Sequence, residues 1–255
     1  MIRSFAVACG VMLFCTLGAP AMARESGPRA SAPQAIDVLE AEAQGLVTVK
    51  YIPNDARSAQ ILVRNTSKRP LTLRLPAAFA GIPVLAQMGM NQGAGFGAGG
   101  IGGAPQTTGG GAGMGGMGGG GMGGMGGMGG GAFSIPPEAT RTLRVATVCL
   151  EHGKPEPNTR HPYKLAELES FSADPNLAIV MERFGRGELP QKVAQAAAWH
   201  LASGLSWEQL AAEKIDHAGG VPDEPYFSPA ELMAAQRAVA LTMRATEQVI
   251  TSPTE

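Results

Sequence analysis

The spacing of apolar residues changes near Leu150, and this change constrains the fold more than any other feature of the sequence. Before it, apolar and polar residues alternate, as in Leu46–Pro53, which is the period of a half-buried strand. After Pro155 the apolar residues recur at helical spacing. The sequence therefore predicts an α+β fold, in which a β half of residues 36–150 precedes a helical lobe of residues 151–255.

The β half contains six short candidate strands separated by turn residues. Strands of this length and spacing favour an antiparallel sandwich that is broadly immunoglobulin-like. The sequence TSKRP at 66–70 is predicted to be the loop of a hairpin between the second and third strands. The candidates are Leu46–Pro53, Gln60–Asn65, Leu71–Pro76, Ile82–Gln87, Ala132–Pro136 and Arg141–Leu150.

A glycine-rich tract interrupts this β half between the fourth and fifth candidate strands. It covers residues 89–131 and includes the almost continuous run Gly109–Gly131. Such a sequence buries too little apolar surface to offset the backbone entropy lost on folding. We therefore expect a disordered insertion, which is tolerable because the entropy of loop closure grows slowly with length.

Four helices are predicted in the lobe, where they would form a compact bundle. Each begins with a start signal, either a proline at the first turn or a polar capping residue. Gly204 is a stop signal for the second helix. The start signals are Asp174 before Pro175, Pro190, Ser206 with Gln209, and Ser228 with Glu231.

The N-terminus is typical of a secretory signal peptide. Arg3 supplies the positive charge, and the apolar run of residues 5–17 is too short to span a bilayer. Cleavage is expected after Ala23, followed by a flexible arm over residues 24–35. The protein is therefore predicted to be exported to a periplasm, to the cell surface or into the medium.

The charge, the hydropathy and the motifs of the remaining chain argue against several classes of function. Removal of residues 1–23 leaves 19 basic and 21 acidic residues, a net charge of −2, which argues against nucleic acid and anionic membranes as partners. No later stretch reaches the roughly 20 apolar residues of a transmembrane helix. No Ser-His-Asp or paired-carboxylate arrangement stands out, so we expect a protein that is not an enzyme.

Cys149 is the one cysteine left after signal-peptide removal, since Cys9 and Cys15 precede the cleavage site. Alternation places it on the same strand face as Leu143 and Val145. One interpretation is a small hydrophobic residue in the core. An odd cysteine in an exported protein also raises the question of a dedicated chemical role.

Two short motifs suggest such a role. Val148–Glu151 has the order apolar, Cys, aliphatic, acidic, and Ala194–Trp199 reads apolar, Gln, x, x, apolar, Trp. Over residues 140–215 the chain resembles the thioester domains of bacterial surface proteins (TQXA-like), in which a cysteine ending a β segment is cross-linked to a glutamine in a following helix. The chain departs from that pattern at Ala194, where threonine is common, and at Val148, where an aromatic residue or leucine is usual.

The resemblance implies a Cys149–Gln195 thioester that captures an amine on a partner protein or surface ligand. A thioester of this kind needs shelter from water, which Trp199 would supply. His152 or His200 would act as a base for the incoming nucleophile. No cofactor is expected for this chemistry.

Other interpretations of the sequence remain open. In one, the protein is a non-catalytic structural or binding module with Cys149 in its core. In another, Cys149 and His152 begin a metal site, which the irregular spacing of the later histidines leaves incomplete. A third assigns Cu(I) to the thioethers of the glycine-rich tract, which are soft ligands. The residues concerned are His161, His200 and His217, and Met114, Met117, Met122, Met125 and Met128.

Overall fold

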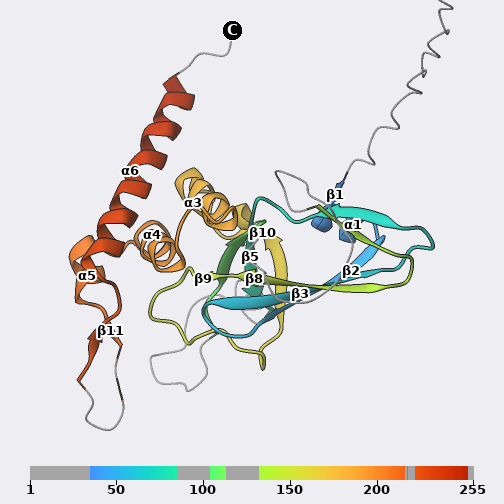
Figure 1. The fold of residues 1–255 in the computed structure, drawn as a ribbon, viewed down its shortest axis with the longest axis horizontal. Coiled ribbons are helices and arrows are strands. Elements are labelled where there is room, and N and C mark those ends of the chain that lie inside the picture. The colour runs from blue at the N-terminus through green and yellow to red at the C-terminus, as the bar shows by residue number, and fades with distance from the viewer. Residues whose placement is uncertain (1–34, 85–103, 113–131, 216, 218–221, 252–255) are drawn as a thin grey trace, which may run out of the picture. The chain divides into compact units, whose positions relative to one another are not determined.

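The computed structural model describes residues 35–84, 104–112, 132–215, 217 and 222–251. The predicted signal peptide, nearly all of the expected arm and the methionine ladder lie outside these ranges. The described part is an α+β structure with a large antiparallel sheet and several helices (Figure 1). The α+β class predicted from the sequence is thereby confirmed.

Seven strands form the large sheet, and every neighbouring pair in it is antiparallel. A second sheet has three strands, β1 (Ile36–Asp37), β4 (Leu71–Arg74) and β7 (Ala132–Ile135), and a short ribbon pairs β11 (Lys214–Ile215) with β12 (Glu224–Pro225). The spatial order of the large sheet is β8 (Thr140–Ala146), β3 (Ser58–Asn65), β2 (Val47–Pro53), β10 (Tyr163–Glu167), β5 (Ala78–Pro83), β6 (Thr108–Gly111) and β9 (Val148–Cys149).

The two sheets share one buried apolar cluster. Alternate residues of β2 and β3 enter it from the large sheet, and β4 and β7 contribute to it from the small sheet. Helix α1 (Val38–Ala43), which the sequence pattern did not predict, adds two residues to the same cluster. Members with little or no exposed surface include Val38, Ala41, Ile61, Val63, Leu73 and Ile135.

The hairpin predicted at 66–70 is wrong, because β3 and β4 belong to different sheets. The buried side chain of Asn65 organises the crossing between them. Its amide nitrogen donates to the carbonyl oxygen of Arg69 at 2.8 Å, and its oxygen accepts from the backbone N–H of Ser67 at 2.9 Å. These side-chain hydrogen bonds satisfy the polar backbone groups of the turn. The chain therefore passes from the large sheet to the three-stranded sheet without pairing between β3 and β4.

The glycine-rich tract contains a buried strand, so the prediction of one disordered insertion over residues 89–131 is wrong for residues 104–112. Strand β6 lies between β5 and β9, and its glycines touch helix α3 (Pro175–Gly185). A Cβ atom on Gly111 would lie 2.5 Å from the carbonyl oxygen of Met181. Glycine is needed here because only a residue without a side chain lets the strand and the helix approach so closely.

The predicted boundary between the two halves also differs from the structure. Strand β10 follows residue 150 in the sequence, yet it lies in the large sheet between β2 and β5. Five residues of β10 pair with β5, from Tyr163 opposite Pro83 to Glu167 opposite Phe79. The helical part of the chain therefore begins after β10, with a 3-10 turn at Leu168–Ser170.

The four predicted helices begin at their start signals, and the second of them ends at its predicted stop signal. Asp174 accepts a hydrogen bond from the backbone N–H of Asn176 at 2.9 Å at the start of α3. Helix α4 (Gln191–Ser203) ends at Gly204, whose φ of 71° is the left-handed conformation that glycine favours. Capping boxes open α5 (Trp207–Ala212) and α6 (Pro229–Thr251).

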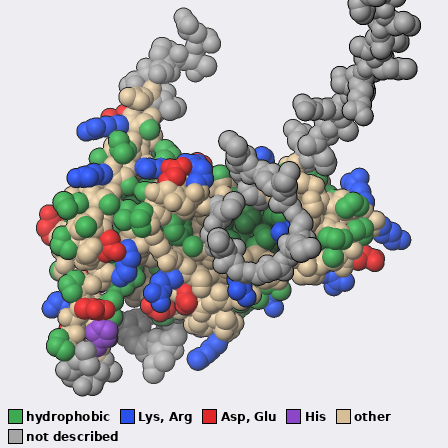
Figure 2. All heavy atoms as spheres, in the orientation of Figure 1, with side chains coloured by type: hydrophobic (Ala, Val, Ile, Leu, Met, Phe, Trp, Pro, Cys, Tyr) green, Lys and Arg blue, Asp and Glu red, His purple; other side chains and the backbone are tan. Residues whose placement is uncertain are grey.

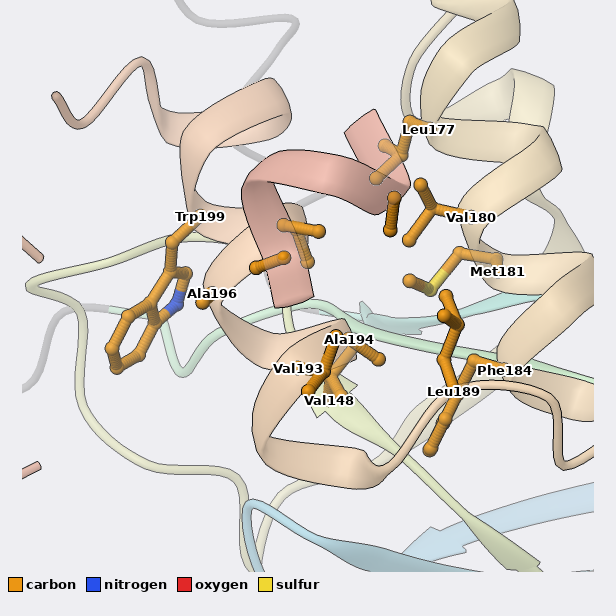
Figure 3. Packing of buried hydrophobic residues seen from close by; sticks show 14 of the residues in the cluster. Val148, Leu177, Val180, Met181, Phe184, Leu189, Val193, Ala194, Ala196 and Trp199 are labelled. Carbon is orange, nitrogen blue, oxygen red and sulfur yellow. The ribbon is translucent and has the colours of Figure 1, made fainter. Parts of the chain in front are cut away.

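Helix α4 packs against α3 and α6 around a second apolar cluster. In Figure 3, Leu177, Val180, Met181 and Phe184 point from α3 toward the residues of α4. Val148 of strand β9 belongs to the same cluster, so the last strand of the large sheet is packed into the helical part. Within the described ranges, no helix has the length and apolar character needed to cross a membrane.

Replacing Gly111 with Ala should lower the free energy of unfolding by about 1–3 kcal/mol, the usual cost of overpacking a close-packed site. The new Cβ meets the backbone oxygens of Met181 and Ala77, which cannot rotate away. Urea denaturation checks this, with Thr142→Ala on the exposed face of β8 as a control that should change little. Equal midpoints for the two variants would show that β6 is not packed against α3.

Candidate functional site

The outer edge of β9 is covered by the side chain of Gln195 from helix α4. On its inner side, Cys149 of β9 is paired with Thr108 of β6. On its outer side, the backbone N–H of Cys149 donates to Oε1 of Gln195 at 2.9 Å, and Nε2 of Gln195 donates to the carbonyl oxygen of Cys149 at 2.7 Å. One side-chain amide thus takes the place of the next strand and satisfies an edge that would otherwise be unpaired.

Gln195 is part of a polar stripe along α4 that binds the segment 147–152. Gln191, one turn earlier, donates to the carbonyl oxygen of Thr147 at 2.8 Å. Ser203, two turns later, donates to the carbonyl oxygen of Leu150 at 2.9 Å and accepts from the backbone N–H of His152 at 2.9 Å. Since these positions differ by multiples of four, they lie on one helical face. The stripe fixes α4 against β9 and the loop that follows it.

Cys149 and Gln195 are both enclosed, with exposed fractions of 2% and 4%. The removal of water from the thiol raises the pKa of Cys149 to about 12, and the nearby charges of Glu156 and Asp55 act in the same direction. The sulfur atom lies 3.9 Å from the carbonyl oxygen of Ala56. The group at Cys149 is therefore a neutral thiol at physiological pH.

The two hydrogen bonds hold the Gln195 amide against the backbone of Cys149, with each end of the amide on a different backbone group. The carbonyl oxygen Oε1 accepts the N–H of the residue that carries the thiol. A backbone donor at this position polarises a carbonyl and stabilises the negative charge that develops on its oxygen during nucleophilic attack. The nitrogen Nε2, which would leave as ammonia, is held by the carbonyl oxygen of the same residue. A thiol, a side-chain amide and a backbone donor to the amide oxygen thus belong to two residues in direct contact.

A small pocket opens toward Gln195 from the surface. Its volume is about 80 Å³, and its walls include Arg57, Gln191, Lys192 and Tyr226 besides Gln195. This volume is a few times that of a water molecule in the liquid, which is enough for a methylamine-sized group. The pocket therefore gives small molecules access from the surface to the otherwise buried amide of Gln195.

Trp199 and His152, both predicted to support the site, lie against each other. Trp199 is 7% exposed, and the centroid of the His152 ring lies 4.7 Å from its ring in an edge-on arrangement. Nε2 of His152 lies 3.1 Å from a carboxylate oxygen of Glu213. In Figure 3 the indole projects from α4 on the side away from α3.

His200, the other predicted base, is engaged elsewhere. Its Nδ1 atom lies 2.8 Å from the carbonyl oxygen of Leu205, and its ring stacks on Trp207 at a centroid distance of 4.2 Å. These contacts direct His200 to the connection between α4 and α5. The structure thus brings Cys149 and Gln195 together, and separately His152 and Trp199, and it places His200 at the connection between α4 and α5.

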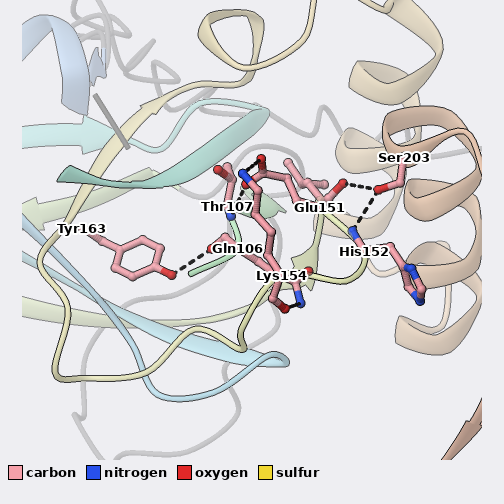
Figure 4. A network of polar contacts seen from close by, with 8 residues as sticks. Gln106, Thr107, Glu151, His152, Lys154, Tyr163 and Ser203 are labelled. Carbon is pink, nitrogen blue, oxygen red and sulfur yellow. Dashed lines mark hydrogen bonds and ion pairs between the residues drawn. The ribbon is translucent and has the colours of Figure 1, made fainter. Parts of the chain in front are cut away.

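A polar network that the sequence did not predict supports the loop after Cys149 (Figure 4). The carboxylate of Glu151 accepts from the backbone N–H of Thr107 at 2.8 Å and forms an ion pair with Lys154. Burial alone would raise the pKa of Glu151, but the bonds from Lys154 and Thr107 hold it below its ordinary value. Tyr163 donates to the carbonyl oxygen of Gln106 at 2.8 Å. No sequence signal marks Gln106 and Thr107, because they lie inside the glycine-rich tract.

Among the described residues, no group of three or more His, Cys, Asp and Glu side chains is placed to hold a metal ion. The histidines are dispersed, with His161 near Asn158 and His217 near Glu224. The methionine ladder lies outside the described residues. On the face that Figure 2 shows, Lys and Arg side chains are interspersed with Asp and Glu.

Comparison with known proteins gives no family for this chain. No protein-family model, curated protein or solved structure matches it. Function is therefore inferred from the residues and contacts of the molecule itself.

Replacing Gln195 with Ala should lower the free energy of unfolding by about 2–5 kcal/mol, because it leaves two buried backbone groups of Cys149 without partners. Denaturant midpoints measure the loss. Gln236→Ala is the matched control, since Gln236 is an exposed glutamine in α6, and it should stay within about 0.5 kcal/mol of the wild type. A Gln195→Ala midpoint as close to the wild type as the control would exclude a buried edge contact.

Replacing Trp199 with Ala should cost about 3–5 kcal/mol, as other large truncations in cores do. The indole packs on His152, Tyr226 and Phe227, so its loss removes a contact shared by three rings. Trp207→Ala provides the comparison, because Trp207 is only partly buried and stacks on His200 alone. The assignment of Trp199 to the core would be refuted if Trp207→Ala proved the more destabilising change in chemical denaturation.

Proposed function

We propose that Cys149 and Gln195 form an internal thioester through which the exported protein attaches itself covalently to an amine on a partner. The observation that carries this proposal is the pair of hydrogen bonds between the Gln195 amide and the backbone of Cys149. The bonds hold the acyl group beside the residue that bears the thiol, and they supply the donor that acyl transfer needs.

The chemistry balances without a cofactor. The thiol sulfur of Cys149 bonds to Cδ of Gln195, the bond from Cδ to Nε2 breaks, and the thiol proton leaves with the nitrogen as ammonia. An amine of the partner later attacks the same carbon, the bond from carbon to sulfur breaks, and an amide and a free thiol result. Each molecule reacts once, so the protein acts as an attachment device and not as an enzyme.

Burial supports this proposal, because a thioester must survive in water until the partner arrives. Cys149 lies in the apolar cluster between β9 and α4, and Trp199 lies in the same cluster. The high pKa of the Cys149 thiol makes its sulfur a slow leaving group, which favours a long-lived thioester once the bond has formed. The same high pKa means that the thiol must give up its proton during its attack on Gln195. Once an amine has attacked, the same high pKa returns the sulfur to its protonated form.

The proposal extends to the setting of the protein. We infer export after cleavage near Ala23, with an immunoglobulin-like sandwich joined to a helical bundle. Two observations support the architecture: the two sheets share one buried cluster, and α4 packs between β9 and the helices α3 and α6. The partner is then a protein or surface ligand that presents an amine.

A second function is favoured by the polar stripe itself. Gln191 and Ser203 bind backbone groups of the same segment, and they take part in no acyl chemistry. In this alternative, Gln195 has the same purely structural task, Cys149 is a core residue, and the protein is a non-catalytic binding or structural module. The two functions differ in covalent structure, so a mass measurement separates them.

The mature protein should be lighter than its sequence mass by one ammonia, and native Cys149 should resist thiol reagents. Methylamine should add to Gln195 and release one titratable thiol, because aminolysis of the thioester frees the sulfur. Intact-mass spectrometry before and after methylamine treatment, followed by peptide mapping, measures each step.

Cys149→Ala and Gln195→Ala should each abolish the mass deficit, since each removes one half of the bond. Gln236→Ala should keep it, because Gln236 is an exposed glutamine of α6 outside the polar stripe of α4. A full sequence mass in the wild type, with no methylamine adduct, would contradict the thioester and favour the structural module.

A further inference from the structure

Lys192 forms part of the wall of the pocket that leads to Gln195. It lies on α4, three residues before Gln195, and both residues line the pocket. Its ammonium nitrogen lies 4.0 Å from the centroid of the Tyr226 ring and 5.9 Å from that of the Phe227 ring. The same nitrogen donates a hydrogen bond to the carbonyl oxygen of Tyr226. The amine is therefore held by two aromatic rings and a carbonyl group at once.

These groups together have the chemistry of a binding site for a primary ammonium. Aromatic faces attract cations, and a carbonyl oxygen accepts one of the three N–H donors that a primary ammonium carries. Trp199 holds both rings in place. The centroid of its ring lies 5.3 Å from that of Tyr226 and 5.8 Å from that of Phe227. We call this set, the two rings and the Tyr226 carbonyl, the ammonium seat.

We propose that the ammonium seat recognises the lysine ammonium of the partner, and that Lys192 fills it as an internal plug until the partner displaces it. This inference rests on the proposed thioester and names the substrate class that the site accepts. Tyr226, which supplies one ring and the carbonyl oxygen of the seat, lines the same small pocket as Gln195, so the seat and the acyl group border one pocket. The seat recognises the partner amine as an ammonium, and the amine attacks only after it has left the seat and given a proton to water.

The plug also explains how a lysine can stay near the thioester without consuming it. An ammonium has no free electron pair, and the nitrogen of Lys192 is held on Tyr226 by its ring and its carbonyl oxygen. The seat favours a primary amine that carries a positive charge and an aliphatic stem. It offers little to a neutral nucleophile, which lacks the charge that the rings attract.

The test compares two nucleophiles on the full mature chain. Nα-acetyl-lysine amide carries a primary ammonium, and hydroxylamine is largely neutral at pH near 7. Lys192→Met removes the charge and keeps the length of the stem. It should accelerate capture of acetyl-lysine amide by about threefold to thirtyfold, the range that follows from the strength of a cation–π contact. The rate with hydroxylamine should change less than about twofold, because that nucleophile does not compete for the seat.

Three further variants test whether the effect depends on the charge of Lys192 and on the ring of Tyr226. Lys192→Gln repeats the loss of charge with a polar side chain, in case the methionine variant folds poorly. Lys164→Met removes an exposed lysine from β10 and should leave both rates unchanged. Tyr226→Leu removes the main ring of the seat, and in the Lys192→Met background it should cancel the acceleration of acetyl-lysine amide capture. Capture is followed by intact mass and by the release of the Cys149 thiol.

The outcomes separate this inference from the proposed function. Absence of the ammonia mass deficit in the wild type overturns both. If the wild type shows the deficit and the Lys192 variants capture acetyl-lysine amide no faster than the wild type, the plug is overturned and the thioester stands. Loss of the deficit in the Lys192 variants alone would also overturn the plug, because it would make Lys192 part of thioester formation.

Discussion

The outer edge of β9 needs hydrogen-bond partners, and helix α4 supplies them one side chain at a time. Without Gln191, Gln195 and Ser203, the buried polar groups of the segment 147–152 would lose their partners at a cost of about 1–3 kcal/mol each. The same bonds fix the position of α4 along the strand, because a shift by one residue would misplace all three side chains. The contact between Cys149 and Gln195 is therefore held in register by its neighbours on both sides.

The glycines of β6 allow α4 to come close enough to β9 to form these hydrogen bonds. Strand β6 separates β9 from the rest of the large sheet, and its missing side chains allow α3 to approach it. Helix α3 in turn packs against α4, so the close contact at β6 determines how near the helical part comes to β9. The aromatic group of Trp199, Tyr226 and Phe227 closes the other side of α4 and borders the pocket onto Gln195. Cys149 is thereby enclosed, while Gln195 keeps a narrow connection to the surface.

Local signals were enough to predict the helices α3 to α6 and the strands β2, β3, β4 and β7, because caps and alternation act within a few residues. They missed α1, and the one strand predicted over Arg141–Leu150 is divided between β8 and β9, which lie at opposite edges of the large sheet. They also singled out Cys149 and Gln195, which lie 46 residues apart and meet in the structure. They missed β6, whose composition disfavours a strand and whose packing depends on Met181, Phe79 and other distant residues. Likewise, β10 was assigned to the helical lobe because its pairing with β2 and β5 has no local signature. No local signal shows that the Gln195 amide binds the backbone of Cys149, since this depends on how α4 docks.

A crystal structure of the mature protein, prepared without amines or reducing agents, tests the central claim most directly. The account predicts continuous electron density from Sγ of Cys149 to Cδ of Gln195, with the amide nitrogen gone and the carbonyl oxygen still accepting from the backbone N–H of Cys149. Separate density for a free thiol, beside an intact amide that bonds both backbone groups of Cys149, would contradict the thioester. It would leave Gln195 as a structural cover for the edge of β9.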